Sequence, residues 1–447
     1  MSRGARIFIW VGSIFTVLGV IAVIVVACMP YVLEHRVNAE IAAIKAKGEP
    51  VTMSDLTMPK IDDSKNGAVL YRQAFQPLSE DRVQKEVDEF TSLCSNPPKN
   101  EDPRWEQGKE LTEKYSRTLE LAEKASALPE CQYHNDWSKR ISKTQFSEFA
   151  GLRLLARLVT INAVVQAHYG NTDSALKSVR LGYKISDSMK DEPTLISQLV
   201  RVGLAAIASR GLTQVTQGGS ITGEQAKGLF DDLGKIDLSS GWKEAMIGER
   251  ASWFEGFGPI RKDGPDSLKE SMDMKPVPIS ASSRKTAVTR AWQERCDRGE
   301  LLWLQDMEKG VALCDLPYRE IKAKGLDKDR PHSKDDLPEL GIGFFAGSLQ
   351  FRDECIAKVA GDQILLALIA FKDTCHRYPD SLDELRTKLG WKIPIDPFSG
   401  KDFVYRRKGD GFIFYSFGPN LKDDGGVEPK EYKDIYTQGD MVWKRDR

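Results

Sequence analysis

The chain has little of the material from which metal and redox sites are built. Its 447 residues include five histidines and seven cysteines. No two histidines stand at the spacing of an HExxH zinc motif, and no two cysteines form a CxxC pair. These absences argue against zinc chemistry and against thioredoxin-like or zinc-ribbon folds. The sequence also lacks a GxSxG nucleophile elbow, a Walker phosphate loop and a GxGxxG dinucleotide motif.

An excess of charge of one sign is also missing. The 64 Lys and Arg residues nearly balance 65 Asp and Glu residues, which leaves a net charge of -1. Nucleic-acid-binding proteins usually carry a basic excess or a basic stripe, so we expect no nucleic-acid partner. A chain of this length corresponds to about two or three domains and can bury a sizeable core.

Patterns that could carry catalysis are few. Ser240 with Lys243 and Ser282 with Lys285 match an SxxK spacing, but neither has the SDN and KTG context that gives this spacing a catalytic meaning. His134 precedes Asn135 and Asp136, and we interpret this stretch as a surface turn rather than an acid–base pair. The sequence therefore predicts no catalytic and no cofactor-binding residue.

The N-terminal segment predicts a membrane anchor. Residues 7–29 form an uncharged, strongly apolar run. As a helix this run would be roughly 34 Å long, enough to cross a bilayer. Arg3 and Arg6 precede it, and the positive-inside rule then places the N-terminus in the cytoplasm. We expect residues 1–6 to be a cytoplasmic tail, residues 7–29 a single transmembrane helix, and the rest of the chain extracytoplasmic (periplasmic).

Two other interpretations of this segment stay open. A cleaved signal peptide is disfavoured because its apolar core is usually about 7 to 15 residues long. A lipoprotein signal is the second alternative, since residues 25–28 resemble a lipobox with Cys28 as the lipidated residue. Both the anchor and the lipoprotein interpretation place the body of the protein on the same side of the membrane.

The middle of the chain has the pattern of helices joined by short polar loops. The best-defined helix is expected at residues 146–168, where apolar residues recur every three or four positions. Together with the helices that follow, it suggests a helical-hairpin array over residues 30–257. Residues 258–283, rich in Pro, Ser, Lys and Asp, predict a loop or linker. A long helix and a loop-like stretch are expected within residues 284–340.

Large aromatic residues concentrate between positions 240 and 303. Core packing is the favoured interpretation, and a partner groove or a peptidoglycan-facing cleft is the alternative. The residues concerned are Trp242, Trp253, Phe254, Phe257, Trp292 and Trp303.

The C-terminal fifth carries a recognisable set of motifs: Arg-Tyr-Pro at 377–379, Ile-Asp-Pro-Phe-Ser-Gly at 395–400, the apolar run 411–418 and the polar loop 420–426. Over residues 350–443 this pattern resembles the C-terminal domain of the major pseudopilin of type II secretion systems. The resemblance implies an α+β domain over residues 341–447, with a long helix on a small antiparallel sheet. Residues 403–407 and 411–416 are the expected strands, joined by a glycine-containing turn. The apolar N-terminal segment lacks the glutamate of pilin subunits, so we do not expect a polymerising pilin.

The same resemblance implies a calcium site in the loop 417–435, because the major pseudopilins bind calcium there. Asn420, Asp423, Asp424 and Asp434 are the candidate ligands, with carboxylate oxygens of the kind that Ca²⁺ prefers. An Asp-Asp-Gly-Gly loop is also ordinary turn chemistry, so an unliganded turn is the alternative.

The cysteines could form disulfides in an oxidising compartment. If the two long helices packed antiparallel, Cys314 could meet Cys355 and Cys296 could meet Cys375, leaving Cys94 and Cys131 to each other. Buried free thiols are the alternative, because cysteine is also a small core residue.

Taken together, the sequence predicts a membrane-anchored extracytoplasmic protein of the cell envelope. Its expected role is interaction or scaffolding with envelope proteins, secretion-related by resemblance. The alternative is an extracytoplasmic enzyme with an unrecognised site in the helical domain. A cleft between positions 130 and 310 lined by convergent carboxylates and aromatics would favour the enzyme.

Overall fold

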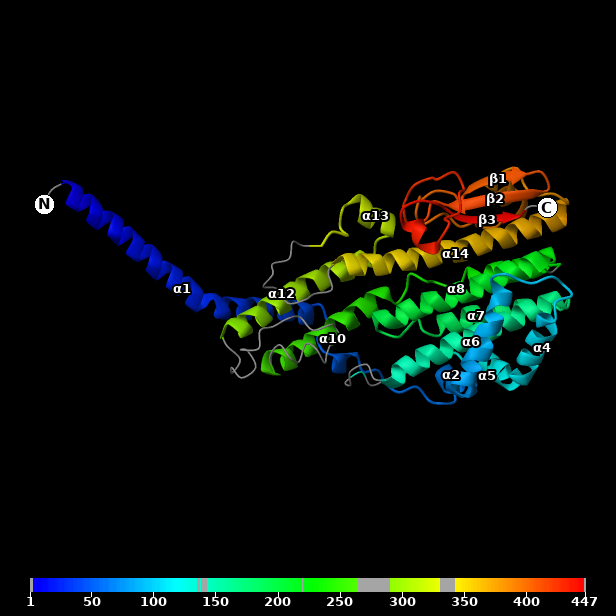
Figure 1. The fold of residues 1–447 in the computed structure, drawn as a ribbon, viewed down its shortest axis with the longest axis horizontal. Coiled ribbons are helices and arrows are strands. Elements are labelled where there is room, and N and C mark those ends of the chain that lie inside the picture. The colour runs from blue at the N-terminus through cyan, green and yellow to red at the C-terminus, as the bar shows by residue number, and fades with distance from the viewer. Residues whose placement is uncertain are drawn as a thin grey trace.

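The computed structural model describes residues 3–134, 137, 143–218, 220–263, 290–329 and 342–445. This part of the chain is mainly helical, with a small three-stranded antiparallel sheet near the C-terminus. Figure 1 shows the sheet lying on one side of α14, with α6, α7, α8 and α10 stacked on the other side of that helix. The helices are α1 (Arg3–Ala46), α2 (Gly67–Phe75), α3 (Asp81–Phe90), α4 (Arg104–Lys114), α5 (Ser116–Ser126), α6 (Lys143–His168), α7 (Thr172–Asp187), α8 (Leu195–Gly218), α9 (Gly223–Leu233), α10 (Trp242–Asp263), α12 (Arg290–Leu313), α13 (Tyr318–Ala323), α14 (Ile342–Cys375) and α15 (Leu382–Leu389).

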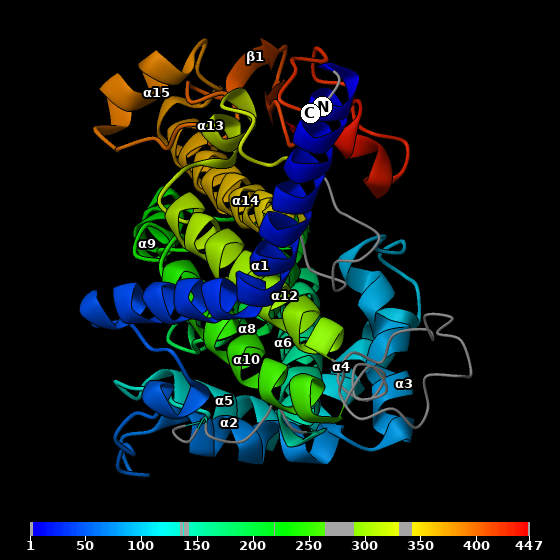
Figure 2. The ribbon, with the colours of Figure 1, turned by 90° about the vertical axis from the view of Figure 1, so that its left-hand side faces the viewer.

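Helix α1 has two parts with different surroundings. Its N-terminal part projects away from the body, and the helix changes direction before it crosses α12 (Figures 1 and 2). Proline inside a helix removes a hydrogen bond and produces a kink, and α1 contains Pro30. The described side chains between positions 7 and 29 are all exposed, with Trp10 at 73%. The described side chains of this apolar segment are therefore open to solvent.

The C-terminal part of α1 is fixed to the body. Leu33, Val37 and Ile44 pack with Leu301 and Leu304 of α12 in one small buried cluster. Close to its end, Lys47 forms an ion pair with Glu308, which also pairs with the buried Arg250. The projecting segment is thus the continuation of a helix that belongs to the body.

Helices α6, α7 and α8 pack on one another as a three-helix unit, and α2, α4 and α5 surround them on one side. The predicted helix at 146–168 is confirmed, because α6 spans Lys143–His168. Close packing needs small residues at the crossings. At Gly211 in α8 an added Cβ would stand 2.8 Å from Thr160 Cγ2 of α6. A side chain at this position would push the two helices apart.

The C-terminal segment and the helical region share one core. A continuous buried cluster runs from Ala163 in α6 to Phe414 in the sheet, and α14 lies in its centre with α8 and α9 packed against it. Gly361 lets β3 approach α14, since a Cβ there would come within 2.2 Å of the Trp443 ring. The C-terminal region is therefore joined to the helical region through a common core.

The sheet confirms the predicted hairpin and adds a strand. The strands β1 (Val404–Lys408) and β2 (Gly411–Ser416) pair antiparallel, and Gly409 in the turn has a φ of 55°. A third strand, β3 (Met441–Arg445), pairs with the other edge of β2 and was not predicted. Every residue of β2 is buried as a result. The short helix α15 begins after Ser381, whose hydroxyl accepts the Glu384 N–H at 3.1 Å and caps the helix.

Several predicted boundaries were wrong. Helix α10 continues to Asp263, into the stretch predicted as a linker, because Phe257 and Ile260 are buried in the main core. Helix α13 forms where a loop was expected, with Tyr318 and Ile321 buried. Residues 264–289 and 330–341, which include most of the predicted linker, lie outside the described residues.

The proposed disulfides were wrong, because all seven cysteines are free. The thiols of Cys314 and Cys355, which were expected to meet, donate hydrogen bonds to backbone carbonyl groups instead. Cys314 Sγ donates to the carbonyl oxygens of Gly310 and Trp242 at 3.4 and 3.5 Å, and Cys355 Sγ donates to that of Val202 at 3.4 Å. The structure therefore agrees with the alternative interpretation, in which the thiols are free and most of them are buried.

Candidate functional site

A cavity of about 420 Å³ lies between α6, α8 and the 3₁₀ turn η3 (Thr91–Cys94). We call it the arginine pocket. Its lining consists of Thr91, Cys94, Ser95, Arg153, Arg157, Thr160, Ile196, Leu199, Val200, Gly203, Leu204, Ile207 and Arg210. This volume falls within the range of about 300 to 1,000 Å³ typical of small-molecule sites.

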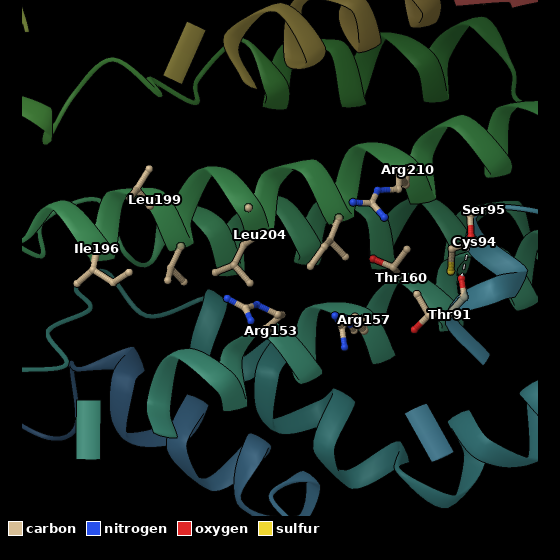
Figure 3. Close-up of a pocket in the computed structure, with 13 residues that line it drawn as sticks. Thr91, Cys94, Ser95, Arg153, Arg157, Thr160, Ile196, Leu199, Leu204 and Arg210 are labelled. Atoms are coloured by element: carbon tan, nitrogen blue, oxygen red, sulfur yellow. Dashed lines mark hydrogen bonds between the residues drawn. The ribbon is translucent and has the colours of Figure 1, made fainter. Parts of the chain in front are cut away.

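Local helix geometry places the arginines. Arg153 and Arg157 are four residues apart on α6 and therefore share one helix face. Arg210 comes from α8 on the facing side, close to Thr160 (Figure 3). Three cationic side chains thus reach one cavity from two helices.

Two of these arginines are electrostatically uncompensated. Arg153 and Arg210 are exposed, and neither has an ion pair or hydrogen bond with another described residue. Arg157 pairs with Asp88, a side chain that is itself 54% exposed. The lining contains no Asp or Glu. The pocket is therefore positive and suited to an anion.

The remaining lining divides into a polar and an apolar end. Figure 3 shows Thr91, Ser95 and Thr160 at the end near Arg210, and Ile196 and Leu199 at the opposite end. Cys94 also lies at the polar end, where its burial raises the pKa of the thiol to about 12 against the lowering effect of Arg210. A thiol with a raised pKa is a poor nucleophile at neutral pH.

A second polar cluster surrounds His134. Its Nε2 lies 2.8 Å from Glu148 Oε2 and its Nδ1 lies 3.2 Å from Glu192 Oε2, both carboxylates being buried. Burial by itself lowers the pKa of His134, but the hydrogen bonds and charges of the two glutamates outweigh it and raise the pKa to about 9. Arg72 also binds Glu148, with Nε to Oε1 at 2.5 Å. The side chain of His134 is therefore held by two carboxylates from other parts of the chain.

Next to this cluster lies a cavity of about 450 Å³ with mixed charge. Its acidic lining residues are Glu130, Asp187, Asp191 and Glu192, and Lys184 and Lys190 also line it. Two of the carboxylates are already engaged, Glu192 with His134 and Asp187 with Arg201 at 2.8 Å. Asn135 and Asp136 lie outside the described residues.

The predicted calcium ligands fall into two places. Asn420 Nδ2 donates to Asp424 Oδ2 at 2.8 Å, and Asp423 Oδ1 accepts from the Tyr415 hydroxyl at 2.9 Å, so these three residues share one loop. Asp434 is used elsewhere, since its Oδ2 accepts the Glu431 N–H at 3.1 Å at the start of the 3₁₀ turn η5 (Tyr432–Tyr436). No group of three or more His, Cys, Asp or Glu side chains in the described parts of the chain is arranged to hold a metal ion.

Sequence reasoning missed Asp440, whose carboxylate binds the backbone of the loop that contains Asp423 and Asp424. Asp440 is fully buried and accepts the backbone N–H groups of Asp424 and Gly426 at 3.3 and 2.7 Å. Burial, together with the charges of Asp423 and Asp424, raises the pKa of Asp440 against the effect of these hydrogen bonds. Asp440 directly precedes β3, and this position could have indicated its role. Strand β3 was itself not predicted.

The SxxK pair that the structure describes has no catalytic geometry. Ser240 Oγ donates to the Asp237 carbonyl at 2.7 Å, and Lys243 Nζ faces Asp315 at 3.4 Å. Ser282 and Lys285 lie outside the described residues.

The aromatic residues between 240 and 303 are core, as predicted. Trp242, Phe257 and Trp303 are buried, and Trp253 and Trp292 pack against them in part.

Within the described residues, one helix, α8, is long and apolar enough to cross a membrane by composition. Its most apolar window is 67% buried inside the protein, so we interpret α8 as a core helix.

Comparison of the chain with protein-family models, curated proteins and solved structures finds no match. The resemblance to pseudopilins therefore continues to depend on the motif residues alone.

Proposed function

We propose that the protein is a single-pass membrane-anchored binding protein, with its body on the extracytoplasmic side and a role in interaction or scaffolding at the cell envelope. The observation that carries this proposal is the form of α1. An apolar helical segment projects from the body with its described side chains exposed, and the same helix continues into a packed segment of the body. Exposing such a segment to water is costly at about 25 cal/mol per Å², whereas a bilayer would cover it.

The sites on the body fit a binding role. The arginine pocket offers charge and apolar surface but no general base, and its thiol is protonated. The similarity of residues 350–443 to the pseudopilin domain adds the expectation that its partners belong to a secretion-type envelope assembly. Calcium at the loop containing Asn420, Asp423 and Asp424, with Asp434 nearby in sequence, is part of the same proposal.

A membrane-extraction experiment tests the anchor. Val17 and Val20 are exposed on the projecting segment, and each arginine placed near the centre of a membrane helix costs about 2.5 to 3.5 kcal/mol. We expect the wild-type chain to stay in the membrane pellet after alkaline carbonate extraction, and the double variant Val17→Arg/Val20→Arg to move to the supernatant. Val17→Leu/Val20→Leu is the matched control and should stay in the pellet. A wild-type chain found in the supernatant would overturn the proposal.

The second candidate function is an extracytoplasmic enzyme, and the cavity beside His134 favours it. Four carboxylates line that cavity, and Tyr71 contributes an aromatic ring. An activity screen of the full chain with ester, phosphoester and glycoside probes tests this candidate. Activity that is lost in Glu192→Gln and retained in the exposed control Glu120→Gln would establish the enzyme, and absence of turnover on every probe would reject it for these substrate classes.

A further inference from the structure

We propose that the arginine pocket binds an amphipathic anion, a single phosphate or carboxylate group attached to an unbranched apolar chain. The head group of this ligand would lie between Arg153 and Arg210. Its apolar chain would leave the pocket by crossing α8 at Gly203. This inference concerns the ligand of the body and does not depend on the membrane topology proposed above.

The charge of the pocket selects the head group. Arg153 and Arg210 are uncompensated within the described residues, and a guanidinium donates paired hydrogen bonds that match phosphate and carboxylate oxygens. A zwitterionic or cationic head would have no carboxylate in the lining to pair with.

The apolar lining requires more than an inorganic ion. Ile196, Leu199, Val200, Leu204 and Ile207 all come from α8 and give the pocket an apolar wall. An inorganic phosphate would fill the charged end only and leave this wall in contact with water. Covering it with hydrocarbon contributes about 0.8 kcal/mol per buried CH₂ group.

Gly203 defines the path of the ligand's apolar chain through the protein. Leu199 and Gly203 line the arginine pocket and also a second cavity of about 250 Å³ between α8 and α14. No atom lies within 4 Å of the place where a Cβ of residue 203 would stand, so the backbone of α8 is open at the point where the two cavities meet. Phe351, which is 42% exposed, lines the second cavity and offers an apolar surface to the end of the chain.

The far end of this path holds one charge of each sign. Glu354 and Lys358 both line the second cavity, and Glu354 Oε2 accepts a hydrogen bond from the Tyr432 hydroxyl at 2.8 Å. The arginine pocket, in contrast, has three arginines and no carboxylate in its lining. A ligand with one anionic end therefore lies with that end in the arginine pocket.

Equilibrium dialysis of the full chain in phosphatidylcholine nanodiscs tests the proposal, with radiolabelled decyl phosphate as the probe and empty nanodiscs as the blank. We expect one saturable site per chain, with a Kd at least tenfold lower than that of inorganic phosphate. Arg153→Gln/Arg210→Gln should raise the Kd for decyl phosphate at least tenfold. Arg117→Gln, an exposed arginine on α5 outside the pocket, is the matched control and should change the Kd less than twofold.

Gly203→Leu tests the path of the chain without a folding defect. The position is exposed within a helix and has free space, and replacing glycine there raises helix propensity by about 0.5 to 1 kcal/mol. We expect Gly203→Leu to raise the Kd for decyl phosphate at least tenfold and to leave the weak binding of inorganic phosphate unchanged.

Three results would overturn the proposal: equal affinity of the double arginine variant and the wild type, equal affinity for inorganic phosphate and decyl phosphate, or unchanged binding in Gly203→Leu. A further arm identifies the source of the ligand. Competition by nanodiscs that contain phosphatidylglycerol assigns the head group to a membrane lipid, and its absence assigns it to a soluble amphiphile.

Discussion

Tyr183 of α7 donates a hydrogen bond to Asp362 of α14, with the two oxygens 2.5 Å apart in the fully buried centre of the main core. These residues are separated by 179 positions in the chain. The bond ties the helical region to the long helix of the C-terminal region. It also leaves a carboxyl group where ionisation is unfavourable, since burial raises the pKa of Asp362 to about 7 against the lowering effects of Tyr183, Ser209 and Lys358.

The first prediction concerns Asp362. The folded state keeps this proton up to about pH 7, whereas an unfolded aspartate loses it near pH 3.8. The folded state therefore binds more protons between these values, so its contribution to stability is present below pH 4 and is lost as the pH rises to 7. At 1.36 kcal/mol per pKa unit the loss is at most about 4 kcal/mol.

We expect Asp362→Asn to raise the Tm at pH 8 and to have little effect at pH 4, because the amide stays neutral at both. Melting curves followed by circular dichroism check this. Asp410→Asn, at an exposed site in the hairpin turn, is the control. A Tm difference between Asp362→Asn and wild type that is the same at both pH values would disprove the assignment.

The second prediction concerns His134. Its pKa is raised from 6.5 to about 9 by Glu148 and Glu192, in spite of its burial. The stabilisation is therefore complete below about pH 6.5 and is lost as the pH rises through 9. We expect the Tm of the wild type to fall between pH 7 and pH 9.5 more steeply than that of His134→Gln. The exposed His35→Gln should follow the wild type. Parallel curves for His134→Gln and wild type would contradict the ion-paired histidine.

The third prediction concerns the buried Arg201. Its guanidinium binds Asp187 at 2.8 Å and the carbonyl oxygens of Asp237 and Ser240 at 2.9 Å. Removing the guanidinium leaves its acceptors without a donor, which costs about 1 to 3 kcal/mol for a buried group, and we expect a loss in this range for Arg201→Met in urea unfolding. Arg180→Met, which breaks a partly exposed pair with Asp232, should cost less than about 1 kcal/mol. Equal losses in the two variants would refute the structural role of Arg201.

The fourth prediction concerns calcium. Because α14 shares its core with α8 and α9, the test needs the full chain rather than a C-terminal fragment. We expect calcium to raise the Tm and Asp424→Asn to abolish the rise. Asp434→Asn removes a cap of η5 and should lower the Tm by the same amount in calcium and in chelator. Identical wild-type melting curves in calcium and in chelator would show that the loop is an unliganded turn.

Local features of the fold were predictable, and long-range ones were not. The Lys408–Gly411 turn and the Ser381 cap depend on neighbouring residues, so their sequence signals were sufficient. Strand β3 has only five residues, and its strand character comes from pairing with β2. The common core likewise depends on contacts between helices far apart in the chain, for which a single sequence contains no local signal.

The same division applies to the sites. Arg153 and Arg157 could have been placed on one helix face from their spacing. Arg210 joins them only because α6 and α8 pack closely at Gly211. The partners of His134 were not predictable for the same reason, since Glu148 and Glu192 reach it from other parts of the fold.

Protease accessibility tests the central claim of a membrane-anchored extracytoplasmic body most directly. Protease added to intact spheroplasts of expressing bacterial cells should degrade the body, since the N-terminal Arg3 and Arg6 side of the anchor is expected inside. A cytoplasmic marker protein should stay intact in the same sample. Full protection of the chain until detergent dissolves the membrane would contradict the account.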